Sequence, residues 1–464
     1  MLSAVRILPN EILLHIFQYV CEENLIQNYP WLLDDSPPTK FTSPAITYLP
    51  AMVISSVCSH WRELALSLPS LWANMTVETY YASEISEEVG FLDTIARYLE
   101  RSGDWPSRLA LDIQGTAFLR KESSLFQLAQ HAHRWKAFKY RGYYPLRYYS
   151  MLFHLHFPSL AELYISSFTQ LVASSDLDRF EHAPKLRALS TDKVPISRAP
   201  YHQLTHLSIQ RIGDASEMTE ALHRYHSVKS IEIELWEINY DLDEDAQLCT
   251  WPNITSLTVR KDHDCSGSEI MMVFFSLSLP SLKELVIEGA GSRCTPWPGE
   301  ALISFISTSS CTITIFTLRD LSLSDLDIIA VLQVMPSLLH LEIDDGEWHN
   351  RYSWQDRQSP ITSLLISNLA QPQFLPKLHS LRLISHNKSG SFNGRVFVSM
   401  VQSRWFRPGS DMFMAMLTAG RGCIRSVVLK FSWREVDAEV YKPLRNLDKE
   451  GLRVVVAGTN GIQV

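Results

Sequence analysis

The sequence predicts an α+β fold: a small unit of three helices, followed by an irregular α/β repeat solenoid with a curved parallel sheet inside and helices and loops outside. Apolar residues near the N-terminus recur at helical spacing. Further along, a short apolar pattern returns at intervals of about 24 residues. The chain has 464 residues, and a single core seldom grows beyond about 250–300 residues. Two domains or an elongated stack are therefore expected.

The bulk composition describes a globular chain with ample core material. Hydrophobic residues make up 46% of the sequence and charged residues 20%. The formal net charge is -8, which argues against nucleic acid as the main partner.

Cysteine usage and apolar runs indicate the compartment. The seven cysteines are widely spaced and include no C-x-x-C pair, so we expect reduced thiols and neither a metal nor a cofactor. The segment Met1 to Val20 contains Asn10 and Glu11 and lacks a small-residue cleavage site, unlike a signal peptide. The apolar run Ile270 to Leu279 is too short to span a bilayer. The expected location is the cytoplasm or nucleus, with no membrane contact.

The first predicted helix lies in Ile7-Leu-Pro-Asn-Glu-Ile-Leu-Leu-His-Ile-Phe-Gln-Tyr-Val20. Pro9 and Glu11 suit its first turn, because proline there forfeits no hydrogen bond and glutamate faces the positive end of the helix dipole. Its apolar residues form one stripe: Ile12, Leu13, Ile16, Phe17 and Val20. Such a helix must bury that stripe against something.

A second helical pattern follows a polar, proline-containing interval over residues 22–50, which we expect to be a surface excursion. The apolar positions of this pattern are Met52, Val53, Val57, Trp61, Leu64, Ala65 and Leu68. It ends at Pro69, and Leu71-Trp72 comes next.

Together these segments resemble the F-box of fungal F-box proteins. The matching residues are Leu8-Pro9-x-Glu11-Ile12-Leu13-x-x-Ile16-Phe17, then Val57-Cys58-x-x-Trp61-Arg62-x-Leu64-Ala65, then Pro69-x-Leu71-Trp72. The resemblance covers residues 5 to about 78. The interval between the two halves is longer than in the minimal motif, which leaves the path of the chain there open but not the flanking helices.

The resemblance implies a non-enzymatic function: the substrate-recognition adaptor subunit of a cullin-RING (SCF-type) ubiquitin ligase. Its F-box would bind a Skp-type adaptor, and through it the cullin and the RING subunit. The implied adaptor-binding residues are Leu8, Pro9, Ile12, Leu13, Ile16, Phe17, Val57, Cys58, Trp61 and Leu64. Each could instead belong to the internal core, and for Phe17 and Trp61 the two roles are equally expected. The alternative function is a ligase-independent protein-interaction scaffold.

Residues 79–105 are predicted to form a connecting helix. Acidic residues in Ser83 to Glu88 open the pattern, Phe91, Ile95 and Leu99 continue it, and Gly103 closes it. The helix could join the F-box domain, residues 1–78, firmly to the following domain, or it could simply cap that domain.

Residues 106–464 carry the repeated pattern apolar-x-x-apolar-x-apolar, as in Leu204-Thr-His-Leu-Ser-Ile209 and Leu338-Leu-His-Leu-Glu-Ile343. Copies begin at positions 135, 160, 186, 204, 228, 254, 282, 313, 338, 361 and 378. The mean spacing of about 24 residues falls within the range of about 20–29 that is typical of leucine-rich repeats. Each copy should be a strand, with helix or loop before the next copy. Residues 398–407 and 424–429 resemble the C-terminal portion of the same fungal proteins, and residues 452–457 should add a terminal cap strand.

The solenoid is expected to bind a protein client, of unknown identity, through the strand residues that project between the buried ones. The candidates are His206, Glu232, Glu234, Arg260, Glu284, Glu288, Arg319, Glu342, Asp344 and Arg382. The middle copies are mainly acidic, which would suit a client segment of basic or mixed charge. The alternative is an ordinary solvated sheet face, because exposed strand positions are usually polar.

Other motifs were weighed as chemical sites and have simpler interpretations. His263-Asp-Cys265 lacks further ligands at metal spacing, and Asp241 to Asp245 lacks the glycine and distal glutamate of a calcium loop. Gly289-Ala-Gly291 lacks the rest of a phosphate loop and is predicted to be a turn. The basic and aromatic run His131 to Arg147 could bind single-stranded nucleic acid. Alternatively, Trp135, Phe138 and Tyr140 are buried repeat positions that leave Lys139 and Arg141 exposed.

Overall fold

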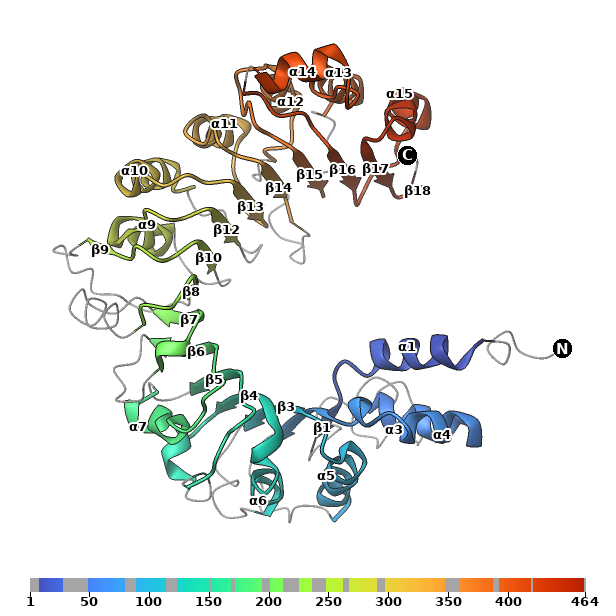
Figure 1. The fold of residues 1–464 in the computed structure, drawn as a ribbon, viewed down its shortest axis with the longest axis vertical. Helices are drawn as coiled ribbons and strands as arrows, with labels where there is room; N and C mark the ends of the chain where they lie inside the picture. The colour runs from blue at the N-terminus through green and yellow to red at the C-terminus, as the bar shows by residue number, and fades with distance from the viewer. Residues whose placement is uncertain are drawn as a thin grey trace. The chain divides into compact units, whose positions relative to one another are not determined.

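A computed structural model of the protein divides into two compact units, Met1–Leu207 and Ser208–Val464 (Figure 1). It describes residues 8–27, 49–79, 89–113, 123–149, 152, 154–167, 172–193, 201–211, 225–235, 248–261, 267–289, 297–346, 359–386, 392–418 and 420–462. Several expected features lie wholly or partly outside these residues: the excursion beyond residue 27, the start of the connecting helix at 83–88, the turn at 289–291 beyond its first residue, and the motifs at 241–245 and 263–265.

The first unit begins with the expected helices α1 (Asn10–Val20), α3 (Pro50–Val57) and α4 (Ser59–Leu66). Pro9 precedes α1, and its carbonyl accepts hydrogen bonds from the backbone of Ile12 and Leu13. Cys58 caps α4, because its Sγ accepts the backbone N–H of Trp61 at 3.4 Å. The rings of Phe17 and Trp61, 5.0 Å apart, join α1 to α4. The helices are present, while their assignment to an F-box stays a prediction.

A parallel sheet follows in which the strands of the first unit lie in sequence order. The strands are β1 (Leu25–Gln27), β2 (Asn74–Thr79), β3 (Ser107–Ile113), β4 (Trp135–Gly142), β5 (Glu162–Ser167) and β6 (Ala188–Lys193). Helices α5 (Val89–Ser102), α6 (Ser123–Ala129) and α7 (Ser174–Leu177) lie between them in the chain. Strand β7 (His206–Arg211) spans the division between the units.

Two of these strands correct the expected course of the N-terminal region. Strand β1 starts only three residues after the predicted excursion begins, pairs with β2, and buries Ile26. Residues 25–27 and 74–79 therefore belong to the sheet and not to a purely helical unit with a surface loop. Strand β1 was not predicted from the sequence, because an apolar run of this length is too short to identify a strand.

Asn24 joins the helices to this sheet. Its side chain is fully buried, and its Nδ2 donates to the carbonyls of Leu71 and Asn74 at 2.9 Å each. Its Oδ1 accepts the backbone N–H of Ala51, in α3, and the hydroxyl of Tyr98, in α5. One side chain thus contacts α3, the start of β2 and the connecting helix. Both roles considered for residues 79–105 are compatible with these contacts, so the role of the connecting helix stays a prediction.

The second unit is a longer run of the same kind. Its parallel strands, in spatial and sequence order, are β8 (Ser230–Leu235), β10 (Ser256–Lys261), β12 (Glu284–Glu288), β13 (Ile315–Arg319), β14 (His340–Asp344), β15 (Ser380–Ser385), β16 (Ser426–Phe431) and β17 (Arg453–Gly458), and the antiparallel β18 (Gly461–Ile462) ends the sheet. The short strands β9 (Cys249–Thr250) and β11 (Leu277–Ser278) pair separately.

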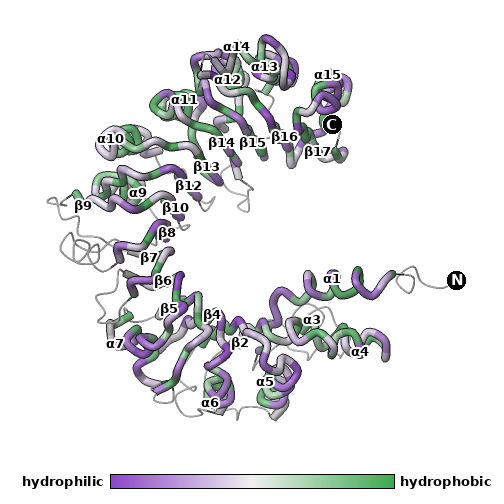
Figure 2. The backbone as a smooth tube through the Cα atoms, in the orientation of Figure 1, coloured by the Kyte–Doolittle hydropathy of each residue, from purple (hydrophilic) through white to green (hydrophobic). Residues whose placement is uncertain are grey.

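Helices of the second unit cover one face of its sheet (Figure 1). They are α9 (Gly267–Ser276), α10 (Gly299–Ser309), α11 (Asp325–Gln333), α12 (Ser363–Ala370), α13 (Gly394–Arg404), α14 (Asp411–Thr418) and α15 (Ala438–Lys449). Hydrophobic and hydrophilic residues alternate along the strands (Figure 2), so one set faces the helices and the other leaves the opposite face polar. This mixed α/β repeat with a long parallel sheet is the predicted solenoid class.

Two backbone features recur at the start of many repeats. In a tight turn, the backbone N–H of the first leucine of the pattern donates to the carbonyl three residues earlier, as Leu282 does to Leu279 and Leu338 to Met335. Proline inside these turns explains the Pro-Ser-Leu signal, because its fixed φ suits the second residue of a turn. One carbonyl of each repeat then accepts two N–H groups of the next, as Thr255 does from Lys283 and Glu284.

One predicted copy of the repeat is wrong. The residues Ile361-Thr-Ser-Leu-Leu-Ile366 begin helix α12 and do not form a strand. Thr362 caps the helix, since its Oγ1 accepts the backbone N–H of Leu365 at 3.3 Å. Apolar residues three and five positions apart fit a buried helix face as well as a strand, so here the cap residue decided the outcome.

Candidate functional site

The apolar stripe of α1 divides into a buried column and an exposed column. Leu13 and Phe17 are 3% and 1% exposed, and they pack inward with Cys21. Ile12 and Ile16, one position earlier in each turn, are 46% and 43% exposed. Residues four apart lie above one another on a helix. The outer column therefore forms a line of unpartnered aliphatic side chains, which continues to Val20.

Helices α3 and α4 add further exposed apolar groups next to α1, with which both are in contact. Val57 is 57% exposed and Cys58 is also exposed, while Trp61 and Leu64 are half-buried. We call the set Leu8, Ile12, Ile16, Val20, Val57 and Leu64 the N-terminal apolar face. An apolar group of this kind on a globular protein marks an interaction site more often than chance exposure.

This division corrects the predicted adaptor-binding set. Leu13 and Phe17 belong to the core, because a unit of three short helices must bury its largest inward residues to be stable. The ring of Trp61 packs against the buried ring of Phe17 and so contacts that core. Leu8, Pro9, Ile12, Ile16, Val57, Cys58 and Leu64 are wholly or partly exposed. Sequence periodicity identified the stripe but could not tell its two columns apart.

The predicted client-binding residues of the second unit lie on the strand face away from the helices. In register across β8, β10, β12, β13 and β14 stand Glu234, Arg260, Glu288, Arg319 and Asp344. Acidic and basic side chains alternate strictly along this row. We call these residues, with Glu232, Glu342 and Arg382 from the neighbouring row, the charge ladder.

The arginines of the charge ladder bridge carboxylates on both sides of their own strands. The Arg260 guanidinium bonds Glu232 through Nη1 and Glu288 through Nε, the latter at 2.7 Å. Arg319 bonds Glu288 at 2.6 Å and Glu342 at 3.1 Å. The arginine side chains are 40 to 48% exposed, whereas the paired carboxylates are 19 to 27% exposed. The guanidinium groups are therefore more exposed to solvent than the carboxylates with which they pair.

Burial and these contacts shift the pKa values of carboxyl groups in the charge ladder. Burial alone would raise the pKa of Glu288, but hydrogen bonds from Arg260 and Arg319 outweigh it and hold that pKa below its usual value. At Asp344, burial is likewise outweighed by hydrogen bonds from His386 and the Gly346 backbone, so its pKa is lowered. Burial dominates at Glu232 and raises its pKa despite the nearby Arg260.

The acidic residues of the middle repeats are therefore largely paired with arginine, although the five acids of the charge ladder still outnumber its three arginines. Glu232, Glu288 and Glu342 are each paired with arginine and do not present free negative charge. Sequence reasoning missed this because partners lie 23 to 31 residues apart and meet only through strand register. Glu284 forms no ion pair with another described residue. His206 lies in the first unit's part of β7, beside Thr205, whose Oγ1 is 2.7 Å from its Nδ1.

The basic and aromatic run adopts the arrangement predicted as the alternative to nucleic-acid binding. Trp135, Phe138 and Tyr140 are buried in β4. Lys139 is exposed and lies 4.9 Å above the ring of Tyr164, while Arg141 is half-buried. These three rings are thus occupied by the core, and of the remaining rings of the run Tyr143 is exposed and Tyr144 is half-buried.

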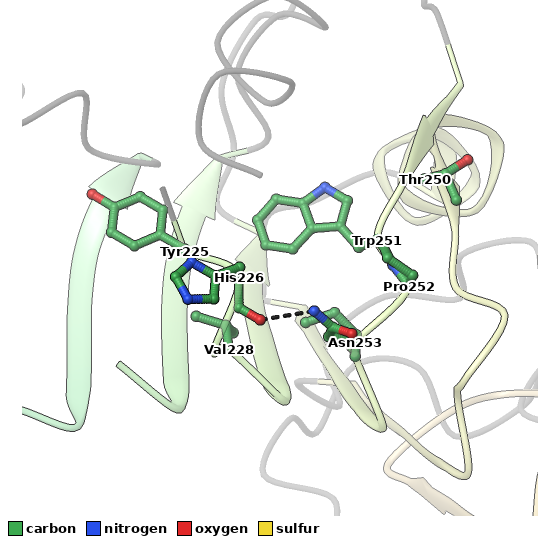
Figure 3. Close-up of a pocket in the computed structure, with 8 residues that line it drawn as sticks. Tyr225, His226, Val228, Thr250, Trp251, Pro252 and Asn253 are labelled. Carbon is green, nitrogen blue, oxygen red and sulfur yellow. Dashed lines mark hydrogen bonds between the residues drawn. The ribbon is translucent and has the colours of Figure 1, made fainter. Parts of the chain in front are cut away.

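A cavity of about 280 Å³ lies where the repeats of β8 and β10 begin (Figure 3). The indole ring of Trp251 points into it opposite Tyr225, and the Asn253 amide closes its floor by donating to the His226 carbonyl at 2.8 Å. Its eight described lining residues include no acid, lysine, arginine or cysteine. The cavity was not expected from the sequence and offers no catalytic arrangement.

Comparisons with known proteins give only a distant structural likeness. No family model matches the chain, and no curated protein matches it. Among solved structures, an internalin from Listeria monocytogenes aligns with a TM-score of 0.27 and 13% identity, covering 64% of this chain and 76% of the internalin. A likeness this low supports no conclusion about function.

Two further findings concern the described part of the chain. None of its helices is long and apolar enough to cross a membrane. Its histidines, cysteines and acids form no group of three or more that could hold a metal ion.

Proposed function

We propose that the protein is a substrate-recognition adaptor of a cullin-RING ubiquitin ligase, with no catalytic activity of its own. The observation that carries the proposal is the N-terminal apolar face. It occurs on helices whose sequence resembles an F-box, and its exposed residues are largely those that the resemblance assigns to a Skp-type adaptor. The cullin and RING subunits would join through that adaptor, in the cytoplasm or nucleus.

The packing of α1 explains how this face could serve as a docking site. The inner column, Leu13 and Phe17, fixes the helix against α4. The exposed side chains of Ile12 and Ile16 are therefore already positioned before a partner binds. Preorganised aliphatic side chains lose little conformational entropy on binding. The Asn24 contacts then hold α3 against the first strands, which would fix the apolar face on the first unit.

The test is the affinity of the full chain for a recombinant Skp-type adaptor, measured by titration calorimetry. Ile16→Asp should weaken binding by at least about thirty-fold, or roughly 2 kcal/mol, because it puts a charge into an apolar interface. Gln18→Asp is the matched control, since Gln18 is exposed on the same helix outside both columns. Leu13→Asp does not serve here, because a charge in the core would unfold the unit.

Unchanged binding by Ile16→Asp, with normal folding by circular dichroism, would contradict the proposal. The alternative function, a ligase-independent scaffold, predicts no adaptor binding by the unmodified chain. The charge ladder is compatible with either function, so it does not discriminate between them.

A further inference from the structure

The charge ladder ends abruptly at β15. Arg260 and Arg319 each bond carboxylates on both neighbouring strands. Arg382 has one acidic neighbour, Glu342, with Nε and Oε2 3.6 Å apart, beyond normal hydrogen-bond distance. In the alternating row, the position after Asp344 is Ile384 and not a charge. The guanidinium of Arg382 therefore keeps both Nη groups available to an incoming acceptor.

The next two strands, β16 and β17, also present no acidic residue on the outward face. The outward residues of β15, β16 and β17 are Ser380, Arg382, Ile384, Ser426, Val428, Lys430, Arg453, Val455 and Ala457. Lys430 and Arg453 are exposed and form no ion pair with another described residue. Val428 and Val455 are half-buried aliphatic residues between them, and Ile384, also half-buried, lies in register beside Lys430. We call these nine residues the terminal patch.

We infer that the terminal patch binds an acidic segment of a protein, with carboxylates on Arg382, Lys430 and Arg453 and aliphatic side chains on Val428 and Val455. This inference rests on the proposed function only in treating the strand face as the client-binding face. It reverses the charge expected of the client, because the acidic residues of the middle repeats are already paired. A basic segment would meet three cations at the patch and be repelled.

The chemistry of the patch favours a protein over a nucleic acid. Phosphates would also attract the three cations, but the outward residues of these strands include no aromatic ring on which a base could stack. A mixed surface of aliphatic groups with arginine is typical of protein interfaces. The planar guanidinium of Arg382 also matches a carboxylate in a bidentate contact.

Fluorescence anisotropy of the full chain with labelled peptides tests the inference. One short peptide alternates glutamate with leucine, a second replaces glutamate by glutamine, and a third replaces it by lysine. The glutamate peptide should bind at least about tenfold tighter than either, and added salt should weaken it. Lys430→Glu with Arg453→Glu should abolish most of this binding. Arg395→Glu, a single charge reversal at an exposed site on helix α13, should not, whereas either Lys430→Glu or Arg453→Glu alone should weaken binding.

Equal binding of the glutamate and glutamine peptides, preference for the lysine peptide, or indifference to Lys430→Glu with Arg453→Glu would overturn the inference. So would tighter binding of a single-stranded uridine oligonucleotide that the same variant weakens. The result is separable from the proposed function. Peptide binding without adaptor binding supports the terminal patch and rejects the ligase role, whereas adaptor binding without peptide binding does the opposite.

Discussion

At the scale of single residues, neighbouring side chains of the same type have opposite roles. Ile12 and Leu13 are adjacent and equally hydrophobic, yet one is 46% exposed and the other 3%. A helix turns by about 100° per residue, so adjacent positions can fall on either side of the boundary between core and solvent. The same boundary separates the cysteines: Cys21 is buried within the first unit and Cys58 is exposed between α3 and α4.

Alkylation of cysteines offers a prediction at this scale. Burial raises the pKa of the Cys21 thiol to about 12, so it should remain unmodified by iodoacetamide at neutral pH in the folded chain. Cys58 should react. If the proposed function is correct, saturating Skp-type adaptor should slow Cys58 modification at least about tenfold, as read from peptide masses. Modification of Cys58 at the same rate with and without bound adaptor would place the adaptor elsewhere.

At the scale of elements, the joint between helices and sheet depends on one buried amide. Asn24 satisfies all of its own hydrogen-bonding groups with partners from three segments. Next to it, the rings of Trp72 and Tyr98 are 5.1 Å apart, and the Arg101 guanidinium lies 4.4 Å over Trp72. A fully satisfied polar group in an apolar setting fixes one arrangement, because any alternative leaves donors and acceptors unpaired.

Replacing this amide should therefore be costly. Asn24→Ala leaves the Ala51 N–H, the Tyr98 hydroxyl and two carbonyls without their partner, and each such group costs about 1–3 kcal/mol. We expect the unfolding free energy, measured with urea, to fall by at least about 2 kcal/mol. Asn253→Ala, which removes a single exposed hydrogen bond to His226, should change it by less than about 0.5 kcal/mol. Similar effects from both substitutions would contradict this role.

The charge ladder should make the second unit sensitive to acid. The pKa of Glu288 is lower in the folded chain than its ordinary value of 4.5, so folding favours its charged form. The resulting stabilisation is fully present above that ordinary value and is lost as the pH falls through the folded-state pKa. Asp344 acts in the same direction from its ordinary value of 3.8, and Glu232, whose pKa is raised, acts in the opposite one.

Urea unfolding between about pH 6 and pH 3 measures this effect. Glu288→Gln removes the titrating group, so the variant should lose less stability on acidification than the unmodified chain. Glu300→Gln, at an exposed position of α10, should follow the unmodified chain. Parallel acid profiles for all three proteins would show that the pairing of Glu288 with Arg260 and Arg319 contributes nothing.

At the scale of the whole molecule, the two candidate surfaces belong to different compact units. The N-terminal apolar face lies within Met1–Leu207 and the terminal patch within Ser208–Val464. A protein that brings a client to a ligase needs this separation, because both partners must be bound at once. In a repeat architecture each strand contacts only its neighbours, so local changes stay local.

The two surfaces should accordingly bind independently. Ile16→Asp should leave the affinity for the glutamate–leucine peptide within about twofold, and Lys430→Glu with Arg453→Glu should leave adaptor affinity within the same limit. Anisotropy and calorimetry on the same preparations measure both. A change of more than about tenfold at the distant surface would reveal energetic coupling between the units.

The amino-acid sequence by itself determined the features that arise from neighbours along the chain. Turn residues before each leucine and alternating apolar residues specify a strand locally, so nearly every predicted copy from Trp135 onward is a strand, with the exception at Ile361. Helix α1 follows from its spacing in the same way, whereas the single helical pattern predicted over Met52 to Leu68 is divided at Cys58 into α3 and α4. Capping by Thr362 was a local signal too, and it outweighed the strand pattern.

Tertiary structure alone decided which of these residues are available to a partner. Ile16 is exposed and Phe17 buried because α4 packs on one side of α1 and not the other. Glu288 is paired and not free, because strand register places it between Arg260 and Arg319, which are 28 and 31 residues away in sequence. Both outcomes depend on contacts between distant segments, and strand periodicity carries no information about which side chain the next strand will supply.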